Sequence, residues 1–471
     1  MLSVGLVIPA SRQPRPGHAA RALLIALVGG VALASGAGDA QAATRPRAVL
    51  ILPFQNVTPG GADGWLGEGI AETLQQAAET TPALLPIDRI RVAQAARAAG
   101  LDSQSGPPDR AGTATLARAL RAELVFYGEY QRTADGGISI VPKLLDTAKG
   151  GEGHALDAVV ASPDRILEGQ AEIILTYAKA LKLGLKPDEA QRLVAAAKPT
   201  TNLTAFEAYA KGRRSFLRSG QEGYEGAAEL FARAIEIDPT FALAHYDLGL
   251  AHLALGNRWK GAAQFRAATQ VDPTMPEPFK ALGDLFMLSP RRLYDQAIEA
   301  YQKALSLRPH YAEAYVGLGD AKAAKGDHEG AIGHYQKALA LDPLNARVHF
   351  SLGKIYYNEK GLYYEAVNAY KKAIELDQYF LDARMGLGEI YEEKGLYRDA
   401  IAEYKKVIEA EPKHTGAHYN LALAYEKVDV KEAITHWERY IGLASQIATE
   451  KEWVDVARQH LKKLRDKEKS Q

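Results

Sequence analysis

The sequence predicts two folds in one chain, an α/β domain at the amino-terminal end and an all-α solenoid of stacked helical hairpins after it. Two observations predict this. Short apolar runs alternate with helical patterns over residues 47–190, which is typical of a sheet covered by helices. A unit of about 34 residues then recurs over residues 205–445, which is typical of a solenoid built from one repeated hairpin.

The amino-terminal part contains apolar runs with the composition of strands, separated by amphipathic patterns. The first run, 48–54, is apolar throughout, as in a strand buried on both faces. Asp135-Gly136-Gly137 separates two later runs and is a hairpin turn signal. We therefore expect a mixed sheet with packed helices. The expected strands are 48–54, 83–87, 123–130, 137–146 and 153–160, and the expected helices are 65–79, 90–99, 113–121 and 163–183.

Four short sequence words in this part resemble the amino-terminal domain of TolB and the related FlgO-type domain. They are Leu52-Pro53-Phe54, Gly67-Glu68-Gly69-Ile70, Glu123-Leu124-Val125 with Gly128, and Leu144-Leu145-Asp146 before Lys149-Gly150. The matching residues are mostly apolar or glycine, so they indicate a fold rather than a chemistry. The resemblance implies an envelope location and contacts with other proteins, and it brings no catalytic residues.

A glycine-rich loop, 59–64, lies between the first strand and the first helix. A phosphate could bind there at the helix amino terminus. However, neither the Gly-Lys-Ser/Thr phosphate motif nor the Gly-x-Gly-x-x-Gly dinucleotide motif with its acidic partner is present. The simpler interpretation is a tight loop that lets the helix pack closely.

Prolines, small residues and aromatic residues recur at fixed places after a linker at 191–204. The proline that ends each unit stands at 239, 273, 309, 343 and 412, with Gln378 in the remaining place. From the second unit on, each first helix carries a Leu-Gly pair, or Leu421-Ala422 in the last unit, and each second helix carries a small residue four positions before an aromatic one. The small residues let two helices approach, the aromatic side chain fills the space beside them, and proline ends the second helix.

These features resemble the tetratricopeptide repeat. The resemblance implies seven hairpins over 205–445, wound into a right-handed superhelix whose concave groove is lined by the first helices and binds proteins. The first unit, 206–239, is looser, and in the last unit Trp437 takes the aromatic position. We expect residues 446–471 to form a capping helix with a basic tail, because a solenoid needs a covered end.

The candidate binding site is this groove. Aromatic and methionine side chains at its positions suit an apolar peptide or an amphipathic helix. Alternatively, tyrosines there are ordinary repeat residues that add stability. Lys280 is followed by Asp284, where the clamp of chaperone-binding members has asparagine, so we do not expect capture of a free carboxy terminus. The selected groove residues are Tyr246, Lys280, Met287, Phe350, Tyr357, Met385 and Tyr419.

Composition and motifs argue against several other classes of function. Lys+Arg and Asp+Glu are each 57, so we expect no nucleic-acid partner, and membrane contact only through partners. The chain has no cysteine, which excludes disulfides and thiolate chemistry. His245, His349 and His418 share a repeat position that is aromatic elsewhere, which indicates packing rather than metal binding. No catalytic constellation is recognisable, so we expect no enzyme activity, cofactor or metal.

Residues 1–43 have the order of a secretory signal peptide. An arginine-containing region precedes an apolar run at 22–34, and Ala40-Gln41-Ala42 offers a cleavage site. Gly29-Gly30 interrupts the run, which makes it a poor membrane span. We expect export and cleavage near Ala42, with a periplasmic mature protein. The alternative is an uncleaved leader that anchors the chain to the membrane.

The sequence therefore predicts a periplasmic, non-enzymatic scaffold for protein–protein interaction, in envelope assembly or in polymer or protein export. One alternative is a ligand-sensing envelope protein, in which the α/β domain binds a small molecule and the repeats relay the signal to a partner. Another is a cytoplasmic regulator, if the leader is misinterpreted. The sequence names neither the partner nor the pathway.

Overall fold

The computed structural model describes residues 46–58, 64–101, 108–149 and 153–469. Residues from Pro46 onward form one compact unit. The expected signal peptide and most of the glycine-rich loop lie outside the described residues. No helix among those described is long and apolar enough to cross a membrane.

The sheet is mixed, as the sequence predicts. In the described residues its main order is β3-β1-β4-β5-β6, while β2 pairs with β4 and β7 with β5. Strand β1 is parallel to β3 and β4, whereas β4 and β5 form an antiparallel hairpin around the predicted Gly136 turn. The strands are β1 Arg47–Ile51, β2 Gln55–Asn56, β3 Leu84–Pro86, β4 Leu124–Arg132, β5 Ile138–Asp146, β6 His154–Ala155 and β7 Val159–Ala161.

The expected strand at 153–160 is divided into β6 and β7. Both pair with β5, but the register moves by one residue between Lys143↔Ala155 and Ile140↔Val159. Pro142 of β5 lies opposite this break, and proline has no N–H with which to continue the ladder. A local bulge follows, a feature that apolar patterning alone does not reveal.

Helices cover both faces of the sheet. Because β1 alternates its side chains, Val49 and Ile51 pack toward α1 (Leu66–Glu79) and α4 (Ile166–Ala180), while Leu50 packs toward α2 (Arg89–Ala98) and α3 (Arg110–Ala119). An additional helix, α5 (Pro187–Ala196), lies against α1 and α4 and has no counterpart in the predicted elements. Leu193 is its one fully buried residue, so its apolar pattern is weak.

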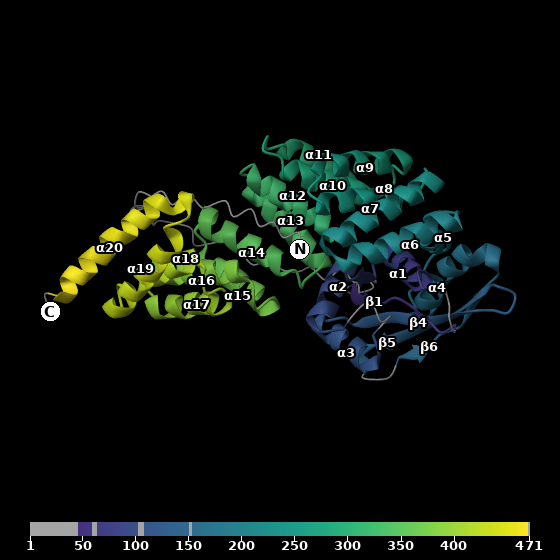
Figure 1. The fold of residues 1–471 in the computed structure, drawn as a ribbon, viewed down its shortest axis with the longest axis horizontal. Helices are drawn as coiled ribbons and strands as arrows, with labels where there is room; N and C mark the ends of the chain where they lie inside the picture. The colour runs from purple at the N-terminus through teal and green to yellow at the C-terminus, as the bar shows by residue number, and fades with distance from the viewer. Residues whose placement is uncertain (1–45, 59–63, 102–107, 150–152, 470–471) are drawn as a thin grey trace, which may run out of the picture. The chain divides into compact units, whose positions relative to one another are not determined.

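Fourteen helices between residues 203 and 444 form seven consecutive hairpins, which confirms the predicted solenoid (Figure 1). A further helix, α20 (Lys451–Lys469), packs on the last hairpin. A π-helical segment, Tyr356–Lys360, extends α14. The paired helices are α6 Leu203–Arg218 with α7 Gly220–Ile237, α8 Ala242–Ala254 with α9 Arg258–Val271, α10 Pro276–Met287 with α11 Tyr294–Leu307, α12 Ala312–Ala324 with α13 His328–Leu341, α14 Ala346–Ile355 with α15 Tyr363–Leu376, α16 Leu381–Glu393 with α17 Tyr397–Ala410, and α18 Thr415–Tyr425 with α19 Val430–Ala444.

The α/β domain and the first hairpins share one hydrophobic core. It runs from the sheet through α1 and α4 into α6, α7 and α8. Trp65 meets Phe206 edge-on, with ring centroids 6.2 Å apart. A Cβ on Gly69 would lie 2.7 Å from Phe206 Cε1, so only glycine allows this approach of α1 to α6. The two folds are therefore joined by packing as well as by the chain.

Candidate protein-binding surface

The candidate surface is formed by one side of the first helix of each hairpin, and we call it the first-helix face. All seven residues selected from the sequence lie on α10, α14, α16, α18, α8 or the π-helical segment. The structure divides the face into two parts. In the amino-terminal part, on α6, α8 and α10, helix α6 packs on α1 of the α/β domain (Figure 1), and ion pairs through Arg213 and Arg308 link α1 to α8 and α10. The carboxy-terminal part, on α12 to α18, carries exposed charged residues.

A first cluster of buried charges joins α1 to α6 and α8. Arg213 Nε lies 3.1 Å from Glu72 Oε1, and Arg213 Nη1 lies 3.2 Å from Asp247 Oδ1. Arg89 of α2 forms an ion pair with Glu68 of α1 and approaches Glu72 to 3.7 Å. All five residues are less than 10% exposed. The cluster thus contains three carboxylates and two guanidinium groups.

A second cluster joins the carboxy-terminal end of α1 to α10 and α11. Arg308, just after α11, forms ion pairs with Glu277 of α10 and with Glu79 of α1, the latter at 3.3 Å. Gln75 donates a hydrogen bond to Glu79 Oε1 at 3.0 Å, and His310 Nε2 lies 3.2 Å from the Glu79 carbonyl oxygen. This cluster contains two carboxylates and one guanidinium group. Together, the clusters link α1 to the first three hairpins.

Burial makes several of these carboxyl groups poor acids. It raises the pKa of Glu79 to about 7, and Glu277 adds to the effect while Arg308 opposes it. It likewise raises the pKa of Asp247 to about 6, against the attraction of Arg213. Burial also raises the pKa of Glu68. These carboxyl groups therefore bind protons at pH values at which isolated carboxyl groups are already ionised.

Three of the selected residues lie in or next to the part of the face that α1 contacts. Tyr246 is partly buried, packs against the shared core, and lies 5.7 Å from the Phe265 ring. Lys280 Nζ donates to Asp284 Oδ2 at 2.8 Å. Burial opposes the charge of Lys280, yet Asp284 keeps the pKa of this lysine above its ordinary value. Met287 is partly buried and packs against the core around α11 and α12.

Phe350, Tyr357 and Met385 lie on the carboxy-terminal part of the face. Phe350 lies 5.0 Å from the Phe380 ring and 5.9 Å from the Tyr370 ring, which leaves it partly buried. Tyr357, in the π-helical segment, donates a hydrogen bond to Glu393 at 2.9 Å. Met385 is partly buried against the core between α17 and α18. Phe350 and Tyr357 are thus close to the same pair of helices, α15 and α16.

Tyr419 lies in the core at the carboxy-terminal end. It is 9% exposed, and it meets Trp437, Tyr440 and Trp453 edge-on at ring-centroid distances of 5.1, 5.2 and 5.8 Å. Trp453 belongs to α20, the capping helix. The structure therefore places Tyr419 beneath this helix rather than on an open surface.

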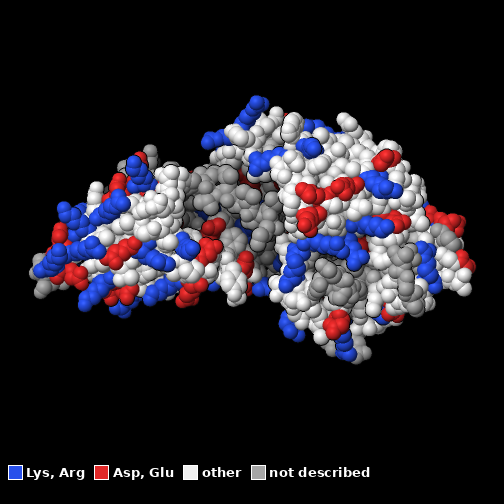
Figure 2. Space-filling view, in the orientation of Figure 1, with Lys and Arg blue, Asp and Glu red and all other residues white. Residues whose placement is uncertain are grey.

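Exposed charged residues of both signs lie on α14 and α16. Figure 2 shows basic and acidic side chains interspersed over the carboxy-terminal repeats. Arg347 donates to Asp320 Oδ2 at 2.5 Å while 65% of its side chain remains exposed. Lys354 Nζ lies 5.6 Å from the centre of the Phe350 ring. Asp382 and Glu393 of α16 are exposed on the acidic side. This part of the surface can therefore meet a partner with both apolar and charged groups.

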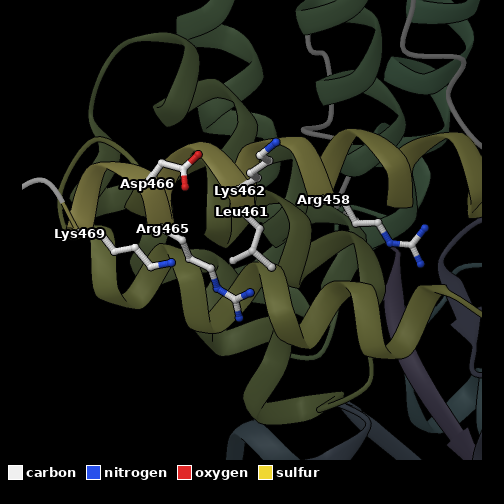
Figure 3. A pocket seen from close by; sticks show the side chains of 6 residues that line it. All are labelled: Arg458, Leu461, Lys462, Arg465, Asp466 and Lys469. Carbon is white, nitrogen blue, oxygen red and sulfur yellow. The ribbon is translucent and has the colours of Figure 1, made fainter.

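Two other depressions lie on the described surface. A depression of about 360 Å³ on α20 is lined by residues of that one helix, with arginine and lysine side chains at its edge (Figure 3). A shallow depression of about 560 Å³ lies on α4 and α5, where Leu175 and Val194 line it. No group of three or more potential metal ligands occurs among the described residues. The ligand-sensing alternative stays a prediction.

The histidines at the shared repeat position are in packing contacts. His418 is 4% exposed, its Nδ1 lies 3.1 Å from His436 Nδ1, and its Nε2 lies 3.1 Å from the Pro412 carbonyl oxygen. Burial lowers the pKa of His418 and lowers that of His436 to about 4. His418 of α18 therefore packs against His436 of α19 within the last hairpin.

The sequence did not reveal that α1 packs on the amino-terminal part of the candidate surface. The residues missed are Glu72, Glu79, Arg213, Asp247 and Arg308. The sequence of α1 did contain a signal of a second neighbour. Besides the apolar residues that pack on the sheet, this helix carries three glutamates. Twelve of its fourteen residues are buried, so a second neighbour had to exist. The neighbour itself lies more than 130 positions away and has no local signature.

Family models for tetratricopeptide repeats match the repeated part of the chain. One, described as TPR repeat, matches residues 221–256, 294–326, 319–359 and 388–429, and another, described as Tetratricopeptide repeat, matches 346–380. These matches fall on hairpins that the structure shows.

Several known proteins are similar over part of the chain. A protein of Rhizobium meliloti (strain 1021) named "Putative adenylate cyclase 3" is 26% identical over 215 residues, which is 45% of this chain and 34% of that protein. The chain thus spans about a third of that relative's length. Among solved structures, one of MamA protein is 30% identical, over 36% of this chain and 92% of that chain, with a TM-score of 0.32. YrrB, described as a TPR protein with an unusual peptide-binding site, is 23% identical, over 43% and 99%, with a TM-score of 0.35.

The geometry and the family models agree on the same helices. Six of the seven hairpins have the close Gly–aromatic contact, and five end at a proline. Residues 221–256, 294–380 and 388–429 are therefore tetratricopeptide repeats.

Proposed function

We propose that this chain is a non-enzymatic scaffold of the bacterial cell envelope that binds a protein partner on the carboxy-terminal part of its first-helix face. One observation carries the proposal: α1 contacts the amino-terminal part, while α14 and α16 carry exposed charges around the partly buried Phe350 and Tyr357. Aromatic side chains are enriched in the cores of protein interfaces, where a few residues dominate the binding energy.

The envelope location rests on two features of the sequence. Residues 1–43 have the order of a signal peptide, and residues 47–190 resemble the TolB amino-terminal and FlgO-type domains. A mixed sheet covered by helices is compatible with that resemblance. We propose export, cleavage near Ala42, and a role in envelope assembly or in polymer or protein export.

Capture of partners from an envelope extract tests the binding surface. The variant Phe350→Ala/Lys354→Glu removes one aromatic contact and reverses one charge on α14. We expect it to retain roughly a tenth or less of the bound partner, because an interface aromatic residue contributes about 2 kcal/mol or more. The control is Arg398→Glu on α17, an exposed charge reversal outside the first-helix face.

Equal capture by both variants would contradict the assignment of the surface. The location is tested separately in a Gram-negative host. The mature chain should appear in the periplasmic fraction and begin near residue 43, whereas an intact Met1 in the cytosolic fraction would contradict export.

A further inference from the structure

We propose that the contact between α1 and the first three hairpins is sensitive to pH: acid holds α1 on the first-helix face, and a rise toward neutral pH loosens it. The contact consists of the Trp65–Phe206 packing and the two charge clusters. It covers Phe206, which is 0% exposed and lies in the same core as Tyr209 and Tyr246. Loosening would therefore uncover aromatic residues on the repeats.

The charge count in each cluster favours bound protons. Glu68, Glu72 and Asp247 share Arg89 and Arg213, so this cluster has one more carboxylate than guanidinium groups. Glu79 and Glu277 share Arg308, which again leaves one carboxylate in excess. A buried charge without a partner is costly, and a carboxylate in this position is neutralised by taking up a proton.

The groups that face Glu79 come from α10, α12 and the segment between α11 and α12, as well as from α1. Arg308 attracts it, Glu277 of α10 and Glu313 of α12 repel it, and Gln75 donates a hydrogen bond. His310 contacts its carbonyl oxygen, and burial lowers the pKa of that imidazole, so it adds little positive charge. The environment of Glu79 is thus more negative than positive.

Asp247 is surrounded in a similar way, whereas Glu68 faces more arginines than carboxylates and its pKa is raised by burial. Asp247 faces Arg213 and the Tyr209 hydroxyl, which donates to it at 2.7 Å, but also Glu72 and Glu277. Glu68 faces Arg89, Arg213 and, with a weaker influence, Arg214, together with Glu72.

The sign of the pH dependence follows from the raised pKa values. When α1 is docked, Glu79 keeps its proton up to about pH 7, and Asp247 keeps its proton up to about pH 6. When the contact is open and solvated, both lose the proton near their ordinary pKa values of 4.5 and 3.8. The docked state therefore binds more protons, and its advantage is lost progressively from about pH 4 to about pH 7.

Hydrogen exchange of the full chain measures this opening. Exchange rates at pH 5 and pH 7.5 are divided by the intrinsic chemical rates, and the protection of α1 and α6 is compared with that of α15. Each proton released can change an opening equilibrium up to about tenfold per pH unit. We therefore expect the protection of α1 and α6 to fall at least about tenfold relative to α15 between these pH values.

The variant Glu79→Gln/Asp247→Asn imitates the protonated groups and leaves each arginine a carboxylate partner, Glu277 or Glu72. We expect its α1 protection to remain high at pH 7.5 and to change less than about threefold. The control is Glu403→Gln, which replaces the partner of Arg384 at 2.9 Å outside the α1 contact and should behave as the wild type. The proposal would be overturned if the wild type lost no protection in α1 between pH 5 and pH 7.5, or lost it equally in α1 and α15. It would also be overturned if the double variant lost as much α1 protection as the wild type.

Discussion

The distance between two paired helices is set by a single missing methyl group at Gly319. A Cβ at this position would lie 2.6 Å from Cε1 of Tyr335, a side chain that is only 2% exposed. Tyr335 cannot move away easily, because its hydroxyl donates to Asp320 Oδ1 at 2.6 Å. The Leu-Gly pairs of the sequence therefore have a direct steric meaning.

Replacing Gly319 should separate α12 from α13. We expect Gly319→Ala to lower the free energy of unfolding by about 1–3 kcal/mol, because extra volume in a packed contact forces side chains and backbone apart. Urea denaturation measures the change. Gly333→Ala on α13 is the matched control, since a Cβ there meets nothing within 4 Å and alanine favours the helix. A Gly319→Ala protein as stable as this control would contradict the steric explanation.

At the scale of secondary-structure elements, the sequence predicted the hairpins but not several other features of the fold. Each hairpin depends on residues close in sequence, such as Gly283 in the first helix and Tyr301 in the second. Helix α5 has one fully buried residue and too weak a pattern, and the β6–β7 break depends on Pro142 of a neighbouring strand. The position of Tyr419 depends on its contact with Trp453 of α20. The sequence predicts that this helix caps the array, but not which residues it covers.

Helix α20 should stabilise the last hairpin and little else. Val454 and Ala457 are 3% and 0% exposed and contact the core around Trp437, so a chain that ends at Ile447 would expose this core. In a repeat array each unit contacts mainly its neighbours. We expect hydrogen-exchange protection to fall in α18 and α19 and to remain unchanged in α8 and α9. Uniform loss along the array would show that its stability is not local.

At the scale of the molecule, the α/β domain serves as a neighbour of the repeats. Its α1 lies between the sheet and α6, with Phe206 fully buried in the core that both parts share. The two fold classes were predictable because each has its own periodicity. Their contact was not, because the Glu72–Arg213 and Glu79–Arg308 pairs join residues whose separation in sequence carries no pattern.

This contact changes how the candidate site is understood. Tyr246 and Tyr419 were selected by the same rule as Phe350, yet the structure places one beside the α1 contact and the other beneath α20. Sequence position within a repeat predicts which side of a helix a residue occupies, but not what covers that side. Phe350, Tyr357 and Met385 stay as the predicted contacts for a partner.

Site-specific photo-crosslinking in cells tests the central claim most directly. A photoreactive residue replaces Lys354, exposed on α14, or Asn368, exposed on the second helix α15 of the same hairpin. We predict that the probe at 354 crosslinks to a discrete protein partner and that the probe at 368 does not. Equal crosslinking at both positions, or none at 354 while the partner is still captured by the chain, would contradict a binding site on the carboxy-terminal part of the first-helix face.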